Sequence, residues 1–288
     1  MRQGIIKTYK LFIGGAFPRS ESGRALPVLN RDGSVFAECC KASRKDLREA
    51  VTAARKALGP WGKLSAYDRG QIIYRMAEMV QSRRGEFAEL LMLDAACTQS
   101  AAEREIDLAA DRLVAFAGWA DKVPQVLGAQ NPVVGPYWNI TTPVALGCVG
   151  IVPVGDTLLG LLTLVGATIA TGNTVVVLTS ANAAAVSSLG EALATSDLPG
   201  GVINILTGDL AELVPVLAGH RDVDGILASG LPDDLVKVVQ LGAAENLKRI
   251  ALIEPAQISA DAAHATATSL RLLEASVEAK TVWHPVGI

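Results

Sequence analysis

The sequence is poor in the side chains that bind metals or act as nucleophiles. It holds three histidines, scattered at positions 220, 264 and 284, and four cysteines, at positions 39, 40, 97 and 148. Neither set follows metal-ligand or disulfide spacing, and a bridge between the adjacent Cys39 and Cys40 would be strained. The sequence therefore predicts no metal site, and reduced thiols of the kind found in cytoplasmic proteins. No cysteine follows Cys148.

An excess of basic charge is also missing. The formal net charge is −3, which gives no electrostatic footprint for nucleic acid or for an anionic membrane. The first ten residues lack the apolar stretch of a secretory signal, so a cytoplasmic protein is expected. What the sequence does have is 288 residues, half of them apolar, which are enough for one large domain and a smaller piece.

Charged residues are absent from Thr157 to Leu178. The pattern around this stretch predicts a strand, a helix and a second strand, at Cys148–Val152, Thr157–Ala170 and Thr174–Leu178. Two apolar strands joined by an apolar helix are typical of a parallel βαβ unit that is covered on both faces. A membrane span is the alternative. The break at Thr171–Asn173 and the lack of basic flanks favour the βαβ unit.

Strands and helices alternate along most of the chain. Before the βαβ unit, a hairpin at Leu11–Pro18 with a Gly14-Gly15 turn and two more strands, Leu26–Leu29 and Val35–Cys40, precede four amphipathic helices. The predicted helix limits are the Ser43 cap and Gly59–Trp61, the Ser65 cap and Arg83–Gly85, Glu86–Ala96, and Ser100–Lys122. After the unit, strands at 202–206, 225–227 and 250–253 alternate with helices at 183–194, 210–217 and 233–241. This order predicts an α/β fold with a doubly wound parallel sheet.

The segment from Gln125 to Gly147 has a different pattern. Prolines 132, 136 and 143 punctuate it, and Tyr137–Thr142 alternates as a strand does. An aromatic, β-branched strand between prolines is expected at the edge of a sheet.

Several motifs together resemble the aldehyde dehydrogenase superfamily. They are GCVGIVP and ATGNTVVVL in the βαβ unit, GWADK at Gly118–Lys122, LPGGVINILTG, HRDVDGILASG, and EAKTVW at Glu278–Trp283. The resemblance implies the Rossmann-like cofactor domain of that family, with a small antiparallel oligomerisation element and a family activity of NAD(P)-dependent aldehyde oxidation. Because the ending EAKTVW follows soon after Ile253, the chain resembles a truncated member that lacks the cysteine-bearing catalytic domain.

The resemblance also implies a division of the chain. Residues 1–124 would be the N-terminal strands and helices of the cofactor domain, 125–146 an oligomerisation strand segment, and 147–255 the Rossmann-like core. Residues 256–271 would be a linker that replaces the catalytic domain, and 272–288 a C-terminal helix and oligomerisation strand.

The family's functional positions are changed here. Gly155 matches an asparagine that donates to the oxyanion, and Leu178 and Ala181 match the lysine and glutamate that hold the ribose, so neither can form a charge-assisted hydrogen bond. Asp233 and Asp234 lie where a pyrophosphate needs dipolar or positive partners. The catalytic glutamate matches Ile253, or Glu254 with a one-residue shift, and no cysteine follows. We therefore predict no catalytic residue, weak or lost binding of NAD or NADP, and a degenerate cleft. The cleft residues are Pro153, Gly155, Leu178, Ala181, Gly208, Gly230 and Leu231.

The retained strands predict an assembly role. The resemblance places Tyr137, Trp138, Ile140, Lys280, Val282 and Trp283 in the oligomerisation element. The favoured interpretation is a catalytically inactive structural or regulatory subunit, which assembles with itself or with a full-length aldehyde dehydrogenase. The alternatives are aldehyde oxidation completed by a partner subunit, and a module that binds a small molecule at the carboxyl ends of the strands.

Overall fold

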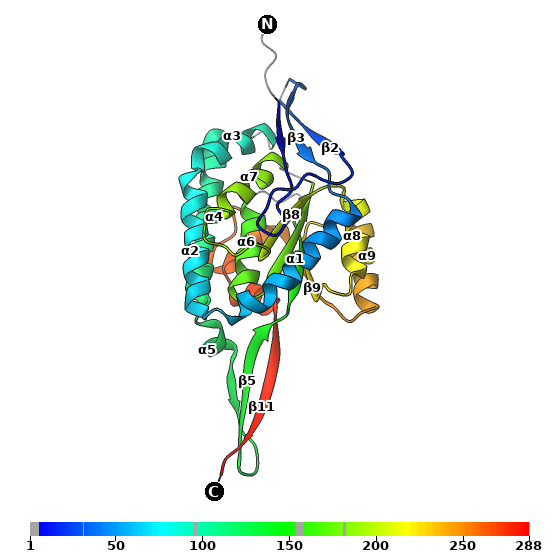
Figure 1. The fold of residues 1–288 in the computed structure, drawn as a ribbon. Helices are drawn as coiled ribbons and strands as arrows, with labels where there is room; N and C mark the ends of the chain where they lie inside the picture. The colour runs from blue at the N-terminus through cyan, green and yellow to red at the C-terminus, as the bar shows by residue number, and fades with distance from the viewer. Residues whose placement is uncertain (1–5, 31, 95–96, 154–157, 181–182, 288) are drawn as a thin grey trace.

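The computed structural model describes residues 6–30, 32–94, 97–153, 158–180 and 183–287, and a parallel sheet of five strands lies at its centre (Figure 1). The strands are β6 (Cys148–Pro153), β7 (Thr174–Thr179), β8 (Ile203–Thr207), β9 (Gly225–Ser229) and β10 (Arg249–Ile253). They pair in the order β10-β9-β6-β7-β8, every pair parallel. The predicted α/β fold with a doubly wound parallel sheet is thus confirmed.

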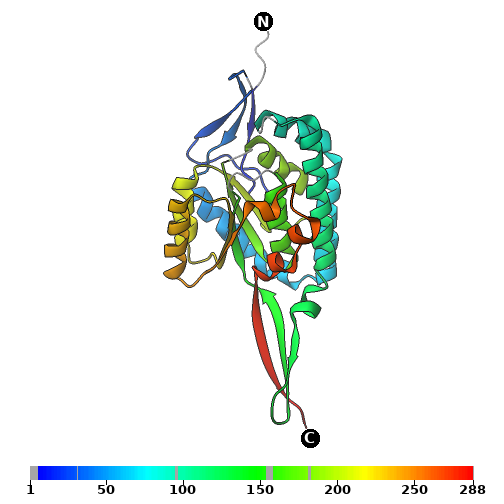
Figure 2. The same cartoon turned by 180° about the vertical axis from the view of Figure 1, so that it is seen from behind.

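Helices cover both faces of this sheet (Figures 1 and 2). One face carries α1 (Arg44–Lys63), α8 (Leu210–Gly219) and α9 (Asp233–Ala244), and the other carries α6 (Leu158–Ala170) and α7 (Ala183–Leu193). Successive strand residues point to opposite faces, so Val175 and Val177 join the α6 core while Val176 and Leu178 join the α1 core. Helices cover β6 and β7 on both faces, which explains why the stretch from Thr157 to Leu178 has no charged residue.

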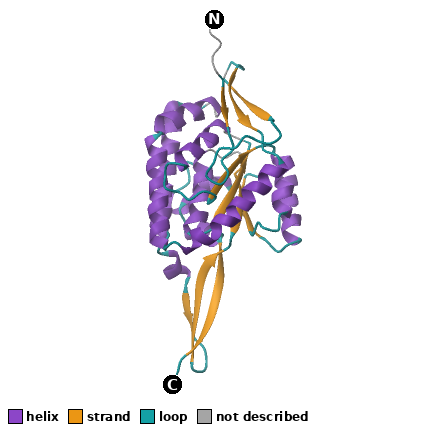
Figure 3. Cartoon of the chain, in the orientation of Figure 1, coloured by secondary structure: helices purple, strands orange, loops and turns teal. Residues whose placement is uncertain are grey.

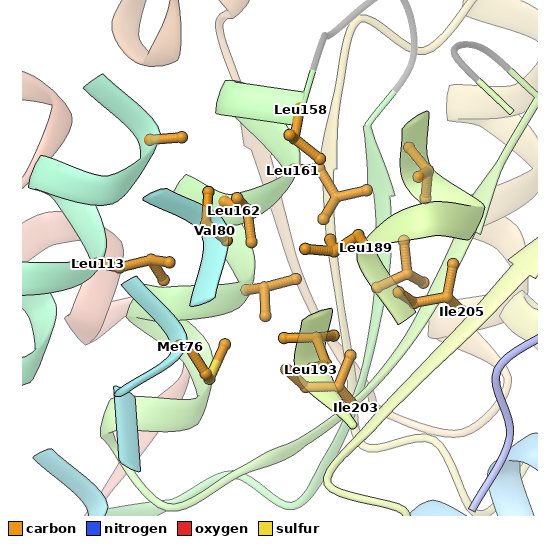
Figure 4. Close-up of a cluster of buried hydrophobic side chains, with 14 of the residues drawn as sticks. Met76, Val80, Leu113, Leu158, Leu161, Leu162, Leu189, Leu193, Ile203 and Ile205 are labelled. Carbon is orange, nitrogen blue, oxygen red and sulfur yellow. The ribbon is translucent and has the colours of Figure 1, made fainter. Parts of the chain in front are cut away.

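A second layer lies over α6 and α7. It is formed by α2 (Ala66–Ser82), α3 (Arg84–Asp94) and α4 (Gln99–Trp119). Figure 4 shows Met76 and Val80 of α2 and Leu113 of α4 directed towards Leu162 of α6 and Leu193 of α7. All residues of α6 are buried, as expected for a helix that is apolar all round. None of the helices in the described part of the chain is long and apolar enough to cross a membrane.

The predicted limits of the first and fourth helices are wrong. The first helix continues through Pro60 to Lys63, because Trp61 is fully buried and its Nε1 donates to the Ile169 carbonyl oxygen at 3.1 Å. Packing of that indole offsets the backbone hydrogen bond that Pro60 lacks. The cap of the fourth helix is Thr98, two residues before the predicted Ser100, and the helix ends at Trp119. The predicted capping box at Ser43 is present, because the Asp46 carboxylate accepts from the Ser43 amide in return. The Ser65 hydroxyl caps α2 by accepting from the Asp68 amide.

The N-terminal strands form their own small sheet. It contains β1 (Lys7–Tyr9), β2 (Ala25–Leu29) and β3 (Val35–Cys40) in the order β1-β3-β2. The predicted hairpin turn lies between β1 and β2, where Gly14 and Gly15 have φ of +62° and +80°. Beside that turn, the backbones of Phe12 and Ile205 exchange hydrogen bonds at 3.0 and 2.7 Å, which attaches the segment to β8.

An antiparallel arm projects from the body (Figures 1 and 3). It follows α5 (Val123–Leu127) and consists of β4 (Ala129–Asn131), β5 (Tyr137–Ala145) and β11 (Val277–Pro285) in the order β11-β5-β4. The predicted edge position of Tyr137–Thr142 is wrong, because β5 is the central strand. Since β4 pairs only with Asn139–Thr141, Pro143 has no β4 neighbour and is tolerated there.

The segment predicted as a linker, 256–271, contains helical turns and packs on the body. The short helices here are α10 (Pro255–Ile258) and α11 (His264–Ala267), followed by α12 (Leu270–Glu274), which lies mostly where a C-terminal helix was predicted. Ile258 and Leu273 are fully buried in the α6 core. Figure 2 shows these helices, in orange, over the part of the sheet face that α6 and α7 leave open. We call α10–α12 the cover segment.

Arg112 of α4 holds the cover segment in place. Its side chain is 1% exposed and donates to the carbonyl oxygens of Ile258 and Ser259, the latter at 2.6 Å, and to Thr163 Oγ1 at 2.8 Å. Burial lowers the pKa of Arg112 to about 10. The guanidinium therefore joins α4, α6 and α10.

Candidate functional site

The carboxyl ends of the five parallel strands form one edge of the sheet, where open α/β sheets bind their ligands. Ser229 ends β9 and lies in register between Pro153 of β6 and Ile253 of β10. It is 1% exposed, and its hydroxyl has no hydrogen-bond partner among the described residues. Among the described residues, β6, β9 and β10 end at this edge in a proline, a serine with a buried hydroxyl and an isoleucine, and the exposed Glu254 follows directly after β10.

The predicted cleft residues that the structure describes are spread along the carboxyl ends of four strands of the sheet, β6 to β9. Gly155 and Ala181 lie outside the described residues. Gly208 follows β8 at one end of the sheet, whereas Gly230 and Leu231 follow β9, and two strands lie between β8 and β9. Pro153 ends β6, between these two positions.

Leu178 does not face a ligand at this edge. It is fully buried and belongs to the apolar core on the α1 and α8 face. Gly208 is needed for close packing, because a Cβ there would lie 2.7 Å from the Leu213 Cδ1 atom. Gly230 has φ of +68°, a conformation that favours glycine after β9.

A cavity of about 480 Å³ lies beside Gly208, between β2 and the start of α8. We call it the β2 cavity. About half of its wall is polar, and Lys41, Ser180 and Asp209 are its polar side chains. The lining residues are Leu26, Pro27, Val28, Leu29, Lys41, Ser180, Ala183, Gly208, Asp209, Leu210 and Ala211. Its volume is within the range of small-molecule pockets.

Asp209 occupies the helix terminus next to this cavity. Its carboxylate accepts from the Ala211 amide at 3.0 Å as the cap of α8, and lies 3.4 Å from the Lys41 Nζ atom. The Lys41 ammonium first, and the Ala211 amide second, hold the pKa of Asp209 below its usual range. The helix terminus, a position that suits a bound anion, is therefore already taken by an internal carboxylate.

Sequence reasoning missed the Lys41–Asp209 pair. Asp209 directly before an apolar helix is a recognisable cap signal, so this half of the pair was detectable. Lys41 lies 168 residues away in the chain, and only the fold brings it to Asp209.

The start of α9 also disfavours an anion. Pro232 directly precedes α9 as its N-cap residue. It has no amide hydrogen to donate, and no side chain caps this helix. Asp233 and Asp234 follow in the first turn, and both are exposed. Two carboxylates at a helix N-terminus interact favourably with the helix dipole and repel a phosphate.

The cysteines are placed as structural residues. All four are free thiols, and Cys39, Cys40 and Cys148 are buried. Burial raises the pKa of Cys148 to about 12, so its thiolate is not populated near neutral pH. Within the described ranges, no group of three or more histidine, cysteine, aspartate or glutamate side chains is arranged to hold a metal ion.

The six residues predicted for oligomerisation all lie in the arm. In the β11–β5 register, Ile140 opposes Val282 and Thr142 opposes Lys280. Because side chains alternate along a strand, Trp138, Ile140, Lys280 and Val282 share one face of the arm. Tyr137 and Trp283 lie on the other face, with ring centroids 5.7 Å apart in an edge-on contact.

Both faces of the arm expose aromatic rings. Trp283 is 58% exposed, Trp138 48%, Val282 47% and Tyr137 46%. In the described sheet, β11 pairs only with β5, so its other backbone edge is open. Exposed apolar side chains beside an open strand edge are features of a surface that another chain covers.

Comparisons with known proteins agree with the resemblance seen in the sequence. The sequence model described as the aldehyde dehydrogenase family matches residues 17–257. The chain is 35% identical over 249 residues to aldehyde dehydrogenase family 2 member B4, mitochondrial, of Arabidopsis thaliana, covering 84% of this chain and 46% of that protein. It is 33% identical over 252 residues to the putative aldehyde dehydrogenase DhaS of Bacillus subtilis, covering 85% and 50%.

Solved structures give the same match. The NAD+ complex of an aldehyde dehydrogenase from Bacillus cereus superposes with a TM-score of 0.81 at 27% identity, covering 86% of this chain and 51% of that chain. This chain therefore spans about half the length of the relatives that it matches.

Proposed function

We propose that this chain, which belongs to the aldehyde dehydrogenase family, is a catalytically inactive member of that family. In this proposal it acts as a structural or regulatory subunit. It assembles through the arm, with a second copy or with an active aldehyde dehydrogenase. The observation that carries the proposal is the arm itself, whose aromatic residues are exposed on both faces beside an open strand edge.

The thiols support the inactive part of the proposal. A nucleophilic cysteine needs a lowered pKa and an accessible sulfur, and Cys148 has neither, because it is buried and its pKa is raised. No cysteine follows it in the sequence. We expect no turnover of simple aldehydes with NAD or NADP above a heat-killed control. Gly155→Asn should restore nothing, since the nucleophile would still be missing. Turnover by the purified protein would contradict this.

The family's cofactor does not fit the residues present. NAD and NADP carry a pyrophosphate, whereas Asp209 fills the α8 terminus and Asp233 and Asp234 occupy the first turn of α9. Leu178, at the position of a ribose-holding lysine, is buried in the core. Two lost charge-assisted bonds at about 1.5–3 kcal/mol each predict NAD binding at least about a hundredfold weaker than at an intact site. Calorimetry that gives a low-micromolar dissociation constant would contradict this prediction.

Mixing with an active partner tests the assembly part. Light scattering after size exclusion would compare this protein, the active aldehyde dehydrogenase of the same cell, and their mixture. We expect the mixture to contain a species whose mass fits neither protein alone. A deletion of 278–288 should abolish that species, because it removes β11 and uncovers β5. A mixed species that persists after this deletion would mean that another surface makes the contact.

The β2 cavity favours a second candidate function, a small-molecule-binding module. Its volume of about 480 Å³, and walls that combine apolar side chains with polar groups, suit a small ligand without phosphates. Titration with adenosine and with ADP distinguishes the two functions, since a pure assembly subunit binds neither. The remaining alternative is that this chain completes the active site of a partner subunit. In that case, aldehyde oxidation would appear only when this protein is mixed with the partner.

A cytoplasmic location stays a prediction. The names of matching relatives include both mitochondrial and cytosolic proteins. Fractionation of the source cells would test it.

A further inference from the structure

A second cavity, of about 640 Å³, lies where the N-terminal strands meet α3. We call it the α3 cavity. Figure 1 shows α3 beside β3 at the end of the molecule opposite the arm. Its lining residues are Lys7, Tyr9, Phe36, Glu86, Glu89, Leu90, Met92 and Leu93. None of them lines the β2 cavity or belongs to the predicted cleft.

Apolar side chains form the walls of the α3 cavity. Tyr9 and Leu90 are 5% and 4% exposed and so provide fixed walls, whereas Phe36 is 38% exposed and has an accessible ring. A pocket with apolar walls and a few polar groups at one side is the usual form of a small-molecule site. Aromatic rings in such a wall can also interact with a cation through their faces.

Two of the three charged lining residues already have partners within the protein. The Lys7 Nζ atom lies 3.4 Å from a Glu191 carboxylate oxygen and 4.3 Å from the centroid of the Tyr9 ring. Glu86 accepts a hydrogen bond from the Ser188 hydroxyl and lies 3.8 Å from Arg83. These contacts fix β1, α3 and α7 around the cavity, and they neutralise both charges.

Glu89 is the charged lining residue without such a partner. It is exposed, and among the described residues it makes no hydrogen bond or ion pair. It lies one helical turn from Glu86 on α3, so both carboxylates are on the cavity side. The unmatched charge of the cavity is therefore negative. An anionic ligand would be repelled, whereas a cationic group would find a partner.

We propose that the α3 cavity binds a small primary amine with a flat apolar body. Its ammonium group pairs with the Glu89 carboxylate, and its body packs against Phe36 and Leu90. The proposal is independent of the assembly role and of the cofactor cleft, because it uses other residues. Its failure would leave those proposals unchanged.

Three probes with the same ring test the charge preference. They are 2-phenylethylamine, 2-phenylethanol and 3-phenylpropionate, titrated into the full-length protein at pH 7 by calorimetry. At this pH the amine is protonated. We expect the amine to bind tightest, the alcohol about threefold to fivefold weaker, as for one partly exposed ion pair, and the carboxylate weakest. Equal affinity for amine and alcohol, or heat from none of the probes, would overturn the proposal.

Two glutamate variants locate the binding. Glu89→Gln should remove the preference for the amine over the alcohol, and leave the affinity for the alcohol unchanged. Glu49→Gln on α1 is the matched control, since Glu49 is also exposed but does not line the cavity. Phe36→Ala should weaken all three probes while keeping their order. The proposal is wrong if Glu89→Gln keeps the full preference, or if Glu49→Gln removes it.

Discussion

In the body of the molecule, α6 buries all 13 of its residues, whereas in the arm β11 buries only one of its 9 residues. Composition explains part of the difference, because α6 has no charged residue whereas β11 contains Glu278, Lys280 and His284, but β11 also exposes Val282 and Trp283. The body surrounds α6 with the sheet, α2 and α4. The arm is a single antiparallel sheet that projects away from the body, with both of its faces outside (Figure 3).

The difference shows which part of the chain needs a partner. The cover segment packs against α6, and its Ile258 and Leu273 are buried in the core of the body. The arm has no such cover, and each aromatic ring that a partner buried would gain about 2 kcal/mol. The following predictions act on one region and spare the other.

The largest effect is expected in the body, from Arg112→Ala. This change removes the donor to Ile258, Ser259 and Thr163, and leaves buried oxygens without a partner. Unsatisfied buried groups and lost charged hydrogen bonds should lower the free energy of unfolding by about 3 kcal/mol. Urea unfolding at fixed protein concentration measures it.

Arg75→Ala is the control for that measurement. Arg75 forms an exposed pair with Glu78 at 3.0 Å, so its loss should cost under about 0.5 kcal/mol. If Arg112→Ala costs no more than Arg75→Ala, the cover segment is not held as described.

An intermediate effect is expected in the arm. Trp138→Ser and Trp283→Ser act on opposite faces, and each should weaken assembly about thirtyfold, the equivalent of about 2 kcal/mol of lost aromatic burial. Neither should change the unfolding of the body. Sedimentation at several concentrations measures the association, with Tyr67→Ser on α2 as a control because that ring is 65% exposed. Loss of association in only one tryptophan variant would identify the face that the partner covers.

The smallest effect concerns pH. The His220 Nδ1 atom accepts from the Asp222 amide at 3.2 Å, which only an unprotonated Nδ1 can do, and burial lowers the pKa of His220. A lowered folded-state pKa gives stability that is present above pH 6.5 and is lost as the pH falls through the folded pKa. Between pH 7 and pH 5 we expect the wild type to lose up to about 1 kcal/mol more than His220→Gln, the size of one hydrogen bond. Parallel pH profiles would refute this.

The sheet could be predicted because each strand is a short apolar run bounded by turn residues, and burial on both faces makes that pattern strong. The Ser43 capping box was equally clear, since its signal is local. The central position of β5 could not be predicted in this way, because its neighbour β11 lies more than 130 residues later in the chain.

The candidate site was less predictable than the fold. The positions of Gly208 and Gly230 along the sheet, and the burial of Leu178 in the core, depend on strand order and packing that the sequence does not display. The helices of the cover segment have only 4 or 5 residues each, too few to show a hydrophobic period. Arg112 showed no signal, because its three acceptors come from two distant segments.

The molar mass of the protein alone tests the central claim, that the arm requires a partner, most directly. Light scattering across a range of concentrations should give at least twice the 30.0 kDa of one chain. It should give a lower mass for Trp138→Ser or Trp283→Ser, and an unchanged mass for Tyr67→Ser. A wild-type protein that stays at 30.0 kDa, soluble at every concentration and also in the mixture with an active aldehyde dehydrogenase, would contradict the account.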